Sequence, residues 1–174
     1  MKIAGIEKNS FVDYPGNIAA VLFTPVCNLN CYYCHNQSLI KPLEEKLINI
    51  ESIIEWLATR KMFLDGVVIS GGEPTLQAGL EEYIEKIKKL GYRVKLDTNG
   101  TQPLILQNLI EKNLIDYVAM DIKAPLPLYP EICGVDISTG HIEDSINLLM
   151  EGRVDYEFRT TFVPQLKEED ILDI

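Results

Sequence analysis

Three cysteines lie within eight residues of one another, and their side chains could hold a metal centre. They are Cys27, Cys31 and Cys34, with the spacing C-x3-C-x2-C. A cluster of four irons is usually held by four thiolates, so three thiolates from one loop leave one iron without a protein ligand. A metal with an open position can bind and activate a small molecule. The spacing therefore favours an iron–sulfur cluster with one open iron.

The spacing alone leaves other kinds of cysteine chemistry open. A structural zinc ion would need a fourth ligand, for which Cys133 or His141 could serve. Structural zinc loops usually come as pairs of C-x2-4-C units, and the sequence contains no second pair. Disulfides suit small secreted chains. A zinc site and inert or redox thiols are thus the alternatives to the cluster.

The composition is that of a globular protein with an acidic balance. The chain has 174 residues, of which 47% are hydrophobic and 24% charged, enough for one domain with a sizeable core. Its net charge of −10 opposes nucleic-acid binding, which needs concentrated Lys and Arg. The longest strongly apolar run, 18–23, is too short to cross a membrane, and no secretory signal is visible. We therefore expect a cytoplasmic protein with reduced cysteines.

Short apolar runs alternate with amphipathic segments along the chain. Strands are predicted over 18–23, 66–70, 92–97, 117–122 and 154–160, and helices over 50–57, 80–87, 103–114 and 142–149. Asn49 is expected to cap the first helix and Gly91 to end the second, and the acidic residues 168–170 predict a fifth. This alternation indicates βαβ units with a parallel sheet. The expected fold is α/β, either an open partial βα barrel or a doubly wound sheet.

Residues that could bind a ligand follow each predicted strand. The cysteines follow the first strand, and the later strands are followed by 70–74, 97–100, 121–123 and Arg159. Taken singly, each of these is an ordinary turn or a surface charge. Ligands of parallel α/β sheets bind at the carboxyl ends of the strands, where all five segments would converge. The sequence therefore predicts a cofactor site whose polar groups orient a small molecule.

Two motifs together resemble the radical S-adenosylmethionine (SAM) superfamily. They are Cys27-x3-Cys31-x-Tyr33-Cys34 and Gly71-Gly72-Glu73-Pro74. A narrower likeness is to the activating enzymes of glycyl-radical proteins, most of all to anaerobic ribonucleoside-triphosphate reductase activators. It rests on the segments 10–16, 34–36, 97–100 and 120–123, and it runs from residue 10 to the end of the chain.

The resemblance implies a mechanism. Cys27, Cys31 and Cys34 would hold three irons of a [4Fe–4S] cluster, and SAM would chelate the fourth through its amino and carboxylate groups. One electron would cleave SAM to methionine and a 5′-deoxyadenosyl radical, which removes a hydrogen atom from a glycine of a partner glycyl-radical enzyme. The electron would come from a low-potential donor such as flavodoxin or ferredoxin. No acid–base catalyst is expected, since the cofactor supplies the chemistry.

The resemblance also implies roles for residues at the strand ends. Backbone groups of Gly71, Gly72 and Glu73 would meet the methionine amino group, and Tyr33 would pack near the adenine. Lys123 and Arg159 could meet a carboxylate, and Asn99 a ribose or a carboxylate. Asp97 and Asp121 would repel each other unless ribose hydroxyls, Lys123 or a bound cation sat between them.

One feature departs from the superfamily pattern. Superfamily cores of this kind have six βα units, whereas five are visible here. We therefore expect residues 1–174 to form a single radical SAM domain that is C-terminally incomplete, with strand five as an exposed edge. Cys133 matches no motif and is interpreted as a structural or incidental thiol. Two other functions stay open: radical chemistry on a small molecule or peptide, and a non-enzymatic iron–sulfur or zinc module.

Overall fold

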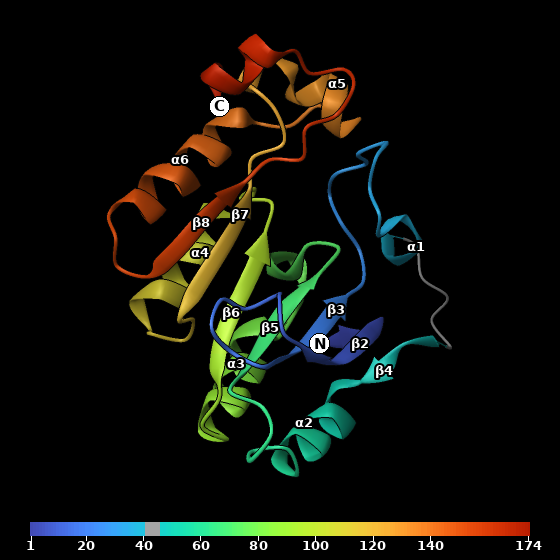
Figure 1. The fold of residues 1–174 in the computed structure, drawn as a ribbon, viewed down its shortest axis with the longest axis vertical. Helices are drawn as coiled ribbons and strands as arrows, with labels where there is room; N and C mark the ends of the chain where they lie inside the picture. Colours follow the sequence, from blue (N-terminus) through green and yellow to red (C-terminus); the bar gives the residue numbers. More distant parts are fainter. Residues whose placement is uncertain (41–45) are drawn as a thin grey trace.

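The computed structural model describes residues 1–40 and 46–174, and its centre is a six-stranded sheet (Figure 1). The strand order is β2-β3-β5-β6-β7-β8. The strands are β2 (Gly5–Ser10), β3 (Ala19–Thr24), β5 (Gly66–Gly71), β6 (Arg93–Thr98), β7 (Tyr117–Asp121) and β8 (Asp155–Arg159). Strands β3 to β8 run parallel, whereas β2 pairs antiparallel with β3. A separate small sheet pairs β1 (Lys2–Ile3) with β4 (Ile48–Asn49).

The five parallel strands are the five that the sequence predicts, so the expected α/β fold is confirmed, and the sheet is consistent with an open partial barrel. Strand β8 stands at the end of the strand order, where the fifth predicted strand was expected. The sequence does not predict β2, because its central residues Glu7, Lys8 and Asn9 are exposed and give no apolar pattern.

Four helices cover one face of the sheet. They are α2 (Ile50–Ala58), α3 (Leu80–Lys89), α4 (Pro103–Glu111) and α6 (Thr139–Met150). Their apolar residues join alternate residues of the strands, such as Leu22, Val94 and Val118, in the main hydrophobic core. The Asn49 side chain caps α2 by accepting the Glu51 N–H at 3.1 Å, as predicted. Gly91 follows α3 with a φ of 91°, also as predicted.

The remaining helical segments are short. They are α1 (Gln37–Ile40), η2 (Pro74–Leu76), η3 (Leu126–Leu128), α5 (Tyr129–Cys133) and η4 (Glu168–Asp173). The helix predicted from 168 onward is present, with Glu168, Glu169 and Asp170 in its first turn, but it is a 3-10 helix. Since η4 buries none of its residues, it has no apolar face to hold a longer α-helix on the protein. In the described part of the chain, no helix is long and apolar enough to cross a membrane.

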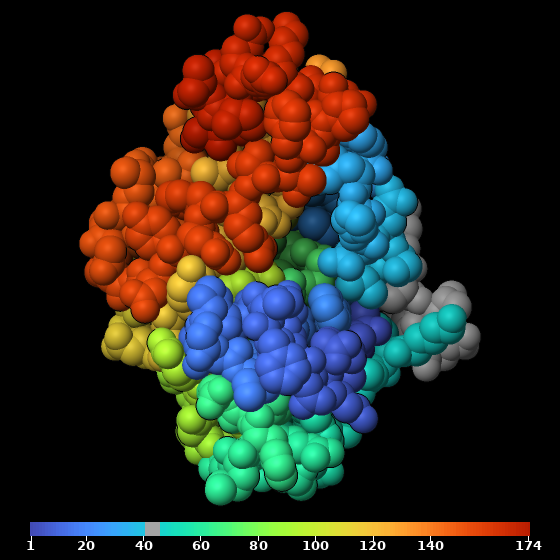
Figure 2. Space-filling view, viewed as in Figure 1, coloured from blue at the N-terminus to red at the C-terminus, as the bar shows by residue number. Residues whose placement is uncertain are grey.

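Among the described residues, no helix layer covers the other face of the sheet, which forms the wall of a hollow. Its alternate residues are mostly apolar on β3 and β5 but charged on β6 and β8, where they include Lys95, Asp97 and Glu157. The turn 11–17 folds over the amino-terminal part of this face, with Tyr14 only 1% exposed. Figure 2 shows a recess between this blue segment, the light-blue residues after β3 and the orange-red residues after β8.

Candidate cofactor site

A cavity of about 220 Å³ lies at the carboxyl ends of the parallel strands. Residues that follow or end all five of them line it. All three predicted metal ligands are among these residues: Cys27, Cys31 and Cys34. So are Tyr33, Gly71, Gly72, Asp97, Asn99, Asp121, Lys123 and Arg159 from the predicted cofactor contacts. The structure thus brings the predicted site residues together, with Glu73 as the exception.

Backbone hydrogen bonds hold the cysteine loop, 25–36, against the turn that follows β5. Gly72 N donates to the Thr24 carbonyl at 2.9 Å, and Glu73 N donates to the Val26 carbonyl at 2.8 Å. Val26 itself has a φ of 69°, a left-handed conformation that is unfavourable for a β-branched residue. The loop therefore leaves β3 through a strained residue that the neighbouring turn fixes in place.

The two glycines of the Gly71–Gly72 turn serve this packing. A Cβ on Gly71 would lie 2.3 Å from Thr24 N, and one on Gly72 would lie 1.9 Å from the Val26 carbonyl oxygen. From the sequence, these glycines are expected to let the backbone approach a ligand. The structure shows a second reason for them, because the close approach is to the backbone of the cysteine loop, although both glycines also line the cavity.

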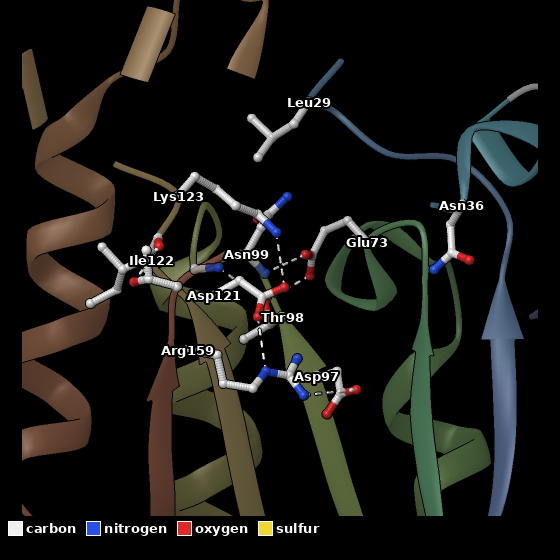
Figure 3. Close-up of polar contacts among 12 residues, drawn as sticks. Leu29, Asn36, Glu73, Asp97, Thr98, Asn99, Asp121, Ile122, Lys123 and Arg159 are labelled. Atoms are coloured by element: carbon white, nitrogen blue, oxygen red, sulfur yellow. Dashed lines mark hydrogen bonds and ion pairs between the residues drawn. The ribbon is translucent and has the colours of Figure 1, made fainter. Parts of the chain in front are cut away.

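Glu73 does not line the cavity, because its side chain turns into the protein and is fully buried. Its carboxylate accepts hydrogen bonds from Thr75 N at 3.1 Å and Thr75 Oγ1 at 2.5 Å. It also accepts from Thr98 Oγ1 at 2.8 Å and from Asn99 N at 2.7 Å (Figure 3). Burial raises the pKa of this carboxyl, and the four donors act in the opposite direction. The side chain of Glu73 thus ties the turn after β5 to the end of β6.

We expect Glu73→Gln to lower the free energy of unfolding by about 2 kcal/mol. The amide NH₂ of Gln is a donor, so it would replace an accepting oxygen and leave a buried N–H or O–H group without an acceptor. Urea unfolding of the cofactor-free protein under reducing conditions measures this loss. Glu85→Gln is the matched control, since Glu85 is partly exposed and lies 3.8 Å from Lys89. That change should stay within about 0.5 kcal/mol. Equal losses for the two variants would contradict the role given to Glu73.

Asparagines brace the cysteine loop from the cavity side. Asn99 donates through Nδ2 to Cys27 Sγ at 3.7 Å and to Asn28 Oδ1 at 3.0 Å. Its Oδ1 accepts from Thr101 N at 3.0 Å and Thr101 Oγ1 at 2.7 Å. Asn36 donates to the Gly71 carbonyl at 3.3 Å. The sequence suggests Asn99 as a ligand contact, whereas its amide group here is engaged by the protein.

A chain of charged groups forms another wall of the cavity. Arg159 lies between the two carboxylates, with its Nη1 3.6 Å from Asp97 Oδ2 and its Nε 2.9 Å from Asp121 Oδ1 (Figure 3). Lys123 Nζ lies 2.9 Å from Asp121 Oδ2. Burial opposes the charge on Asp121, but Lys123 and Arg159 outweigh it and lower the pKa of this carboxyl. The sequence offers Lys123 as a group between the two carboxylates, but Lys123 pairs with Asp121 and the bridge is made by Arg159, which was not predicted.

Cys27, Cys31 and Cys34 all line the same cavity. Among the described residues, no three His, Cys, Asp or Glu side chains gather closely enough to hold one metal ion. A zinc ion needs four ligands at about 2.0–2.3 Å. A four-iron cluster keeps its thiolates further apart, because each thiolate binds a different iron. Three thiols that line one cavity fit a cluster in which each thiolate binds a different iron.

Cys133 lies next to Cys31, a contact that the sequence does not reveal. It is fully buried at the end of α5. A hydrogen bond from its thiol lowers the pKa of Cys31 against the effect of burial. Asn30 N also donates to the Cys133 carbonyl at 2.9 Å, so α5 anchors the middle of the cysteine loop. This placement agrees with the interpretation of Cys133 as a structural thiol.

Tyr33 lines the cavity and carries an unpaired polar group. Its hydroxyl is buried and has no hydrogen-bond partner within the described ranges. Burial raises the pKa of Tyr33 above its usual range, and the charge of Cys31 adds a smaller effect in the same direction. A buried hydroxyl without a partner is costly unless a ligand or water satisfies it. This wall of the cavity is thus suited to a ligand with polar atoms.

Comparisons with known proteins identify the family of this chain. A family model, the Radical SAM superfamily, matches residues 21–174. A Methanocaldococcus jannaschii protein named "Putative glycyl-radical enzyme activating enzyme MJ1227" is 41% identical, over 99% of this chain and 73% of the relative. The pyruvate formate-lyase 1-activating enzyme of Escherichia coli K12 is 32% identical, over 70% of this chain and 52% of the relative. The chain thus spans about half the length of the second relative.

Solved structures share the fold. The structure titled "Native anSMEcpe with bound AdoMet" superposes with a TM-score of 0.60 at 23% identity, over 80% of this chain and 42% of that chain. Streptococcus suis SuiB bound to the precursor peptide SuiA superposes with a TM-score of 0.63 at 17% identity, over 88% of this chain and 34% of that chain. At these identities the likeness is one of fold alone.

Proposed function

The chain belongs to the radical SAM superfamily, and from this premise we propose that it is the activating enzyme of a glycyl-radical protein. The family implies a [4Fe–4S] cluster and SAM as cofactors. When bound, these cofactors supply one-electron cleavage of the SAM sulfonium to methionine and a 5′-deoxyadenosyl radical. We assign the cluster to Cys27, Cys31 and Cys34, because these thiols line one cavity and leave one iron open.

The other residues of the cavity would bind and orient SAM. The enclosed volume of about 220 Å³ is smaller than the roughly 300–1,000 Å³ of most ligand sites, so SAM would extend into the open mouth of the recess. Lys123 and Arg159 are the cations on the cavity wall, and both are suited to a carboxylate. Asp121 neutralises part of their charge, which favours a zwitterionic ligand over a simple anion.

The observation that carries the activating role is the similarity to two proteins named as activating enzymes, at 41% and 32% identity. Such enzymes act on a glycine of a large protein, which brings its own surface to the site. We propose an anaerobic ribonucleoside-triphosphate reductase as that protein, because the segments 10–16, 97–100 and 120–123 resemble its activators. A flavodoxin or ferredoxin is the proposed electron donor.

The test is transfer of the radical to a partner. We expect the reconstituted protein with SAM and a low-potential reductant to produce a glycyl radical on a reductase, seen by electron paramagnetic resonance. The same mixture with Cys31→Ala should show none, because the cluster would lack a ligand. SAM cleavage without a radical on any glycyl-radical protein would overturn the activating role. It would favour radical chemistry on a small molecule or peptide.

A further inference from the structure

Lys95 is a buried cation on the hollow face of the sheet, in the middle of β6. Its side chain is 2% exposed. The ammonium group donates to the Asp13 carbonyl at 2.7 Å and lies 3.0 Å from Asp97 Oδ1 and 3.6 Å from Glu157 Oε1. The Tyr117 ring lies beside it at 5.8 Å. A lysine is rarely buried unless it is paired, so the partners of Lys95 indicate what its ammonium group does.

The contacts of Lys95 lead to the cavity in one direction. Asp97 Oδ1 is buried and has no hydrogen bond of good geometry in the described structure, so the Lys95 ammonium is the group that offsets its charge. The other oxygen of Asp97 faces Arg159, which in turn holds Asp121. Figure 3 shows Asp97, Arg159 and Asp121 in this order at the ends of β6, β8 and β7. Lys95 is thus the inner end of the charged wall.

In the other direction, Lys95 holds the turn 11–17. Its partner there is the Asp13 carbonyl, and the Asp13 carboxylate accepts from Ser10 Oγ at 2.5 Å. Tyr14, the next residue, is buried against Tyr117 with a ring-centre distance of 5.9 Å. The turn does not line the cavity. Lys95 therefore makes direct contact with both the turn and the charged wall.

We infer that Lys95 is a positioning residue for the SAM site. It fixes the charged wall of the cavity relative to the turn 11–17. The inference rests on the proposed function, because it takes the cavity as the SAM site. Without the ammonium group, the buried oxygen of Asp97 loses its counter-charge. Arg159 would then be drawn from Asp121 toward Asp97, and the cation on the cavity wall would be displaced.

Lys95→Met tests this role, since methionine keeps the length of the side chain and removes its charge. We expect SAM to bind the reconstituted variant about tenfold more weakly, as measured by isothermal titration. We also expect faster hydrogen exchange at residues 11–17 in the cofactor-free variant. In the wild type, SAM should slow exchange in this turn, and in Lys95→Met it should not.

Lys88→Met is the matched control. Lys88 Nζ also pairs with a carboxylate, at 2.7 Å from both oxygens of Asp116, but lies outside the cavity. Its loss should affect stability while leaving SAM affinity and exchange of the turn unchanged. Equal weakening of SAM binding in Lys88→Met and Lys95→Met would overturn the inference, because it would show a general effect of stability.

A double-mutant cycle shows whether Lys95 acts through Asp97. In an Asp97→Asn background, Lys95→Met should weaken SAM binding less than about threefold, because the charge of Asp97 that Lys95 offsets is already removed. Full additivity would contradict the inference.

If Lys95→Met does not fold, Lys95→Gln replaces it in both measurements. Wild-type protein that binds no SAM would overturn the proposed function together with the inference, whereas a wild type that binds SAM and a Lys95 variant that binds it equally would overturn the inference alone.

Discussion

Cys31→Ala is expected to abolish cluster assembly, so that iron content after anaerobic reconstitution falls from about four per chain to background. Cys31 is the middle ligand of the loop and is 7% exposed at the cavity wall. With two thiolates left, two irons would lack protein ligands. SAM cleavage should then fall by more than the roughly 100-fold that loss of an outer-shell partner causes. Iron analysis and absorbance near 400 nm measure the first effect.

Cys133→Ala is the control for this change, because Cys133 is equally a buried cysteine but does not line the cavity. It should lower the melting temperature and keep the full iron content. Full iron in Cys31→Ala, or loss of iron only in Cys133→Ala, would show that the assignment of ligands is wrong.

Gly72→Ala is expected to have the largest effect of any change outside the cysteines. Its Cβ would lie 1.9 Å from the Val26 carbonyl oxygen, so the backbone of the cysteine loop has to move. We expect a loss of about 3 kcal/mol or more in the free energy of unfolding, because a backbone atom cannot relax as a side chain does. Iron content should fall as well, since Cys27 follows Val26 directly. Denaturant unfolding and iron analysis of the same preparation measure both effects.

Gly140→Ala is the matched control, because Gly140 lies in α6 and its added Cβ would meet only Ser138 Oγ at 3.7 Å. This change should stabilise the protein by about 0.5–1 kcal/mol through helix propensity, with iron content unchanged. If Gly72→Ala has the same stability and iron content as the wild type, the packing role of this turn is refuted.

Most of the sheet can be predicted from the sequence, because its parallel strands follow apolar runs bounded by turn residues. Strand β2 could not be predicted, since it is held by pairing with β3 while its side chains Glu7 to Asn9 face solvent. The acidic first turn of η4 correctly predicts a helix start at 168, but it does not show that the helix is of the 3-10 type. It has the charge pattern of a helix terminus without an apolar face to bury.

The sequence predicts which residues belong to the site better than it predicts the contacts between them. The carboxyl ends of parallel strands must converge, so the cysteines, Asp97, Asp121 and Arg159 were expected on one rim. Pairing between side chains depends on distances that sequence spacing does not give. The inward turn of Glu73, the bridge of Arg159 between two carboxylates and the contact of Cys133 with Cys31 are of this kind. Lys95 carried a signal, because it alternates with apolar residues on β6 and so faces the hollow side of the sheet.

The most direct measurement is SAM cleavage by the anaerobically reconstituted wild-type protein under dithionite. The account predicts methionine and 5′-deoxyadenosine in equal amounts, formed only when the protein carries about four irons per chain. It also predicts no product from Cys31→Ala treated in the same way. A protein that carries the cluster and leaves SAM intact, or one that binds a single zinc ion at these cysteines, would contradict the account.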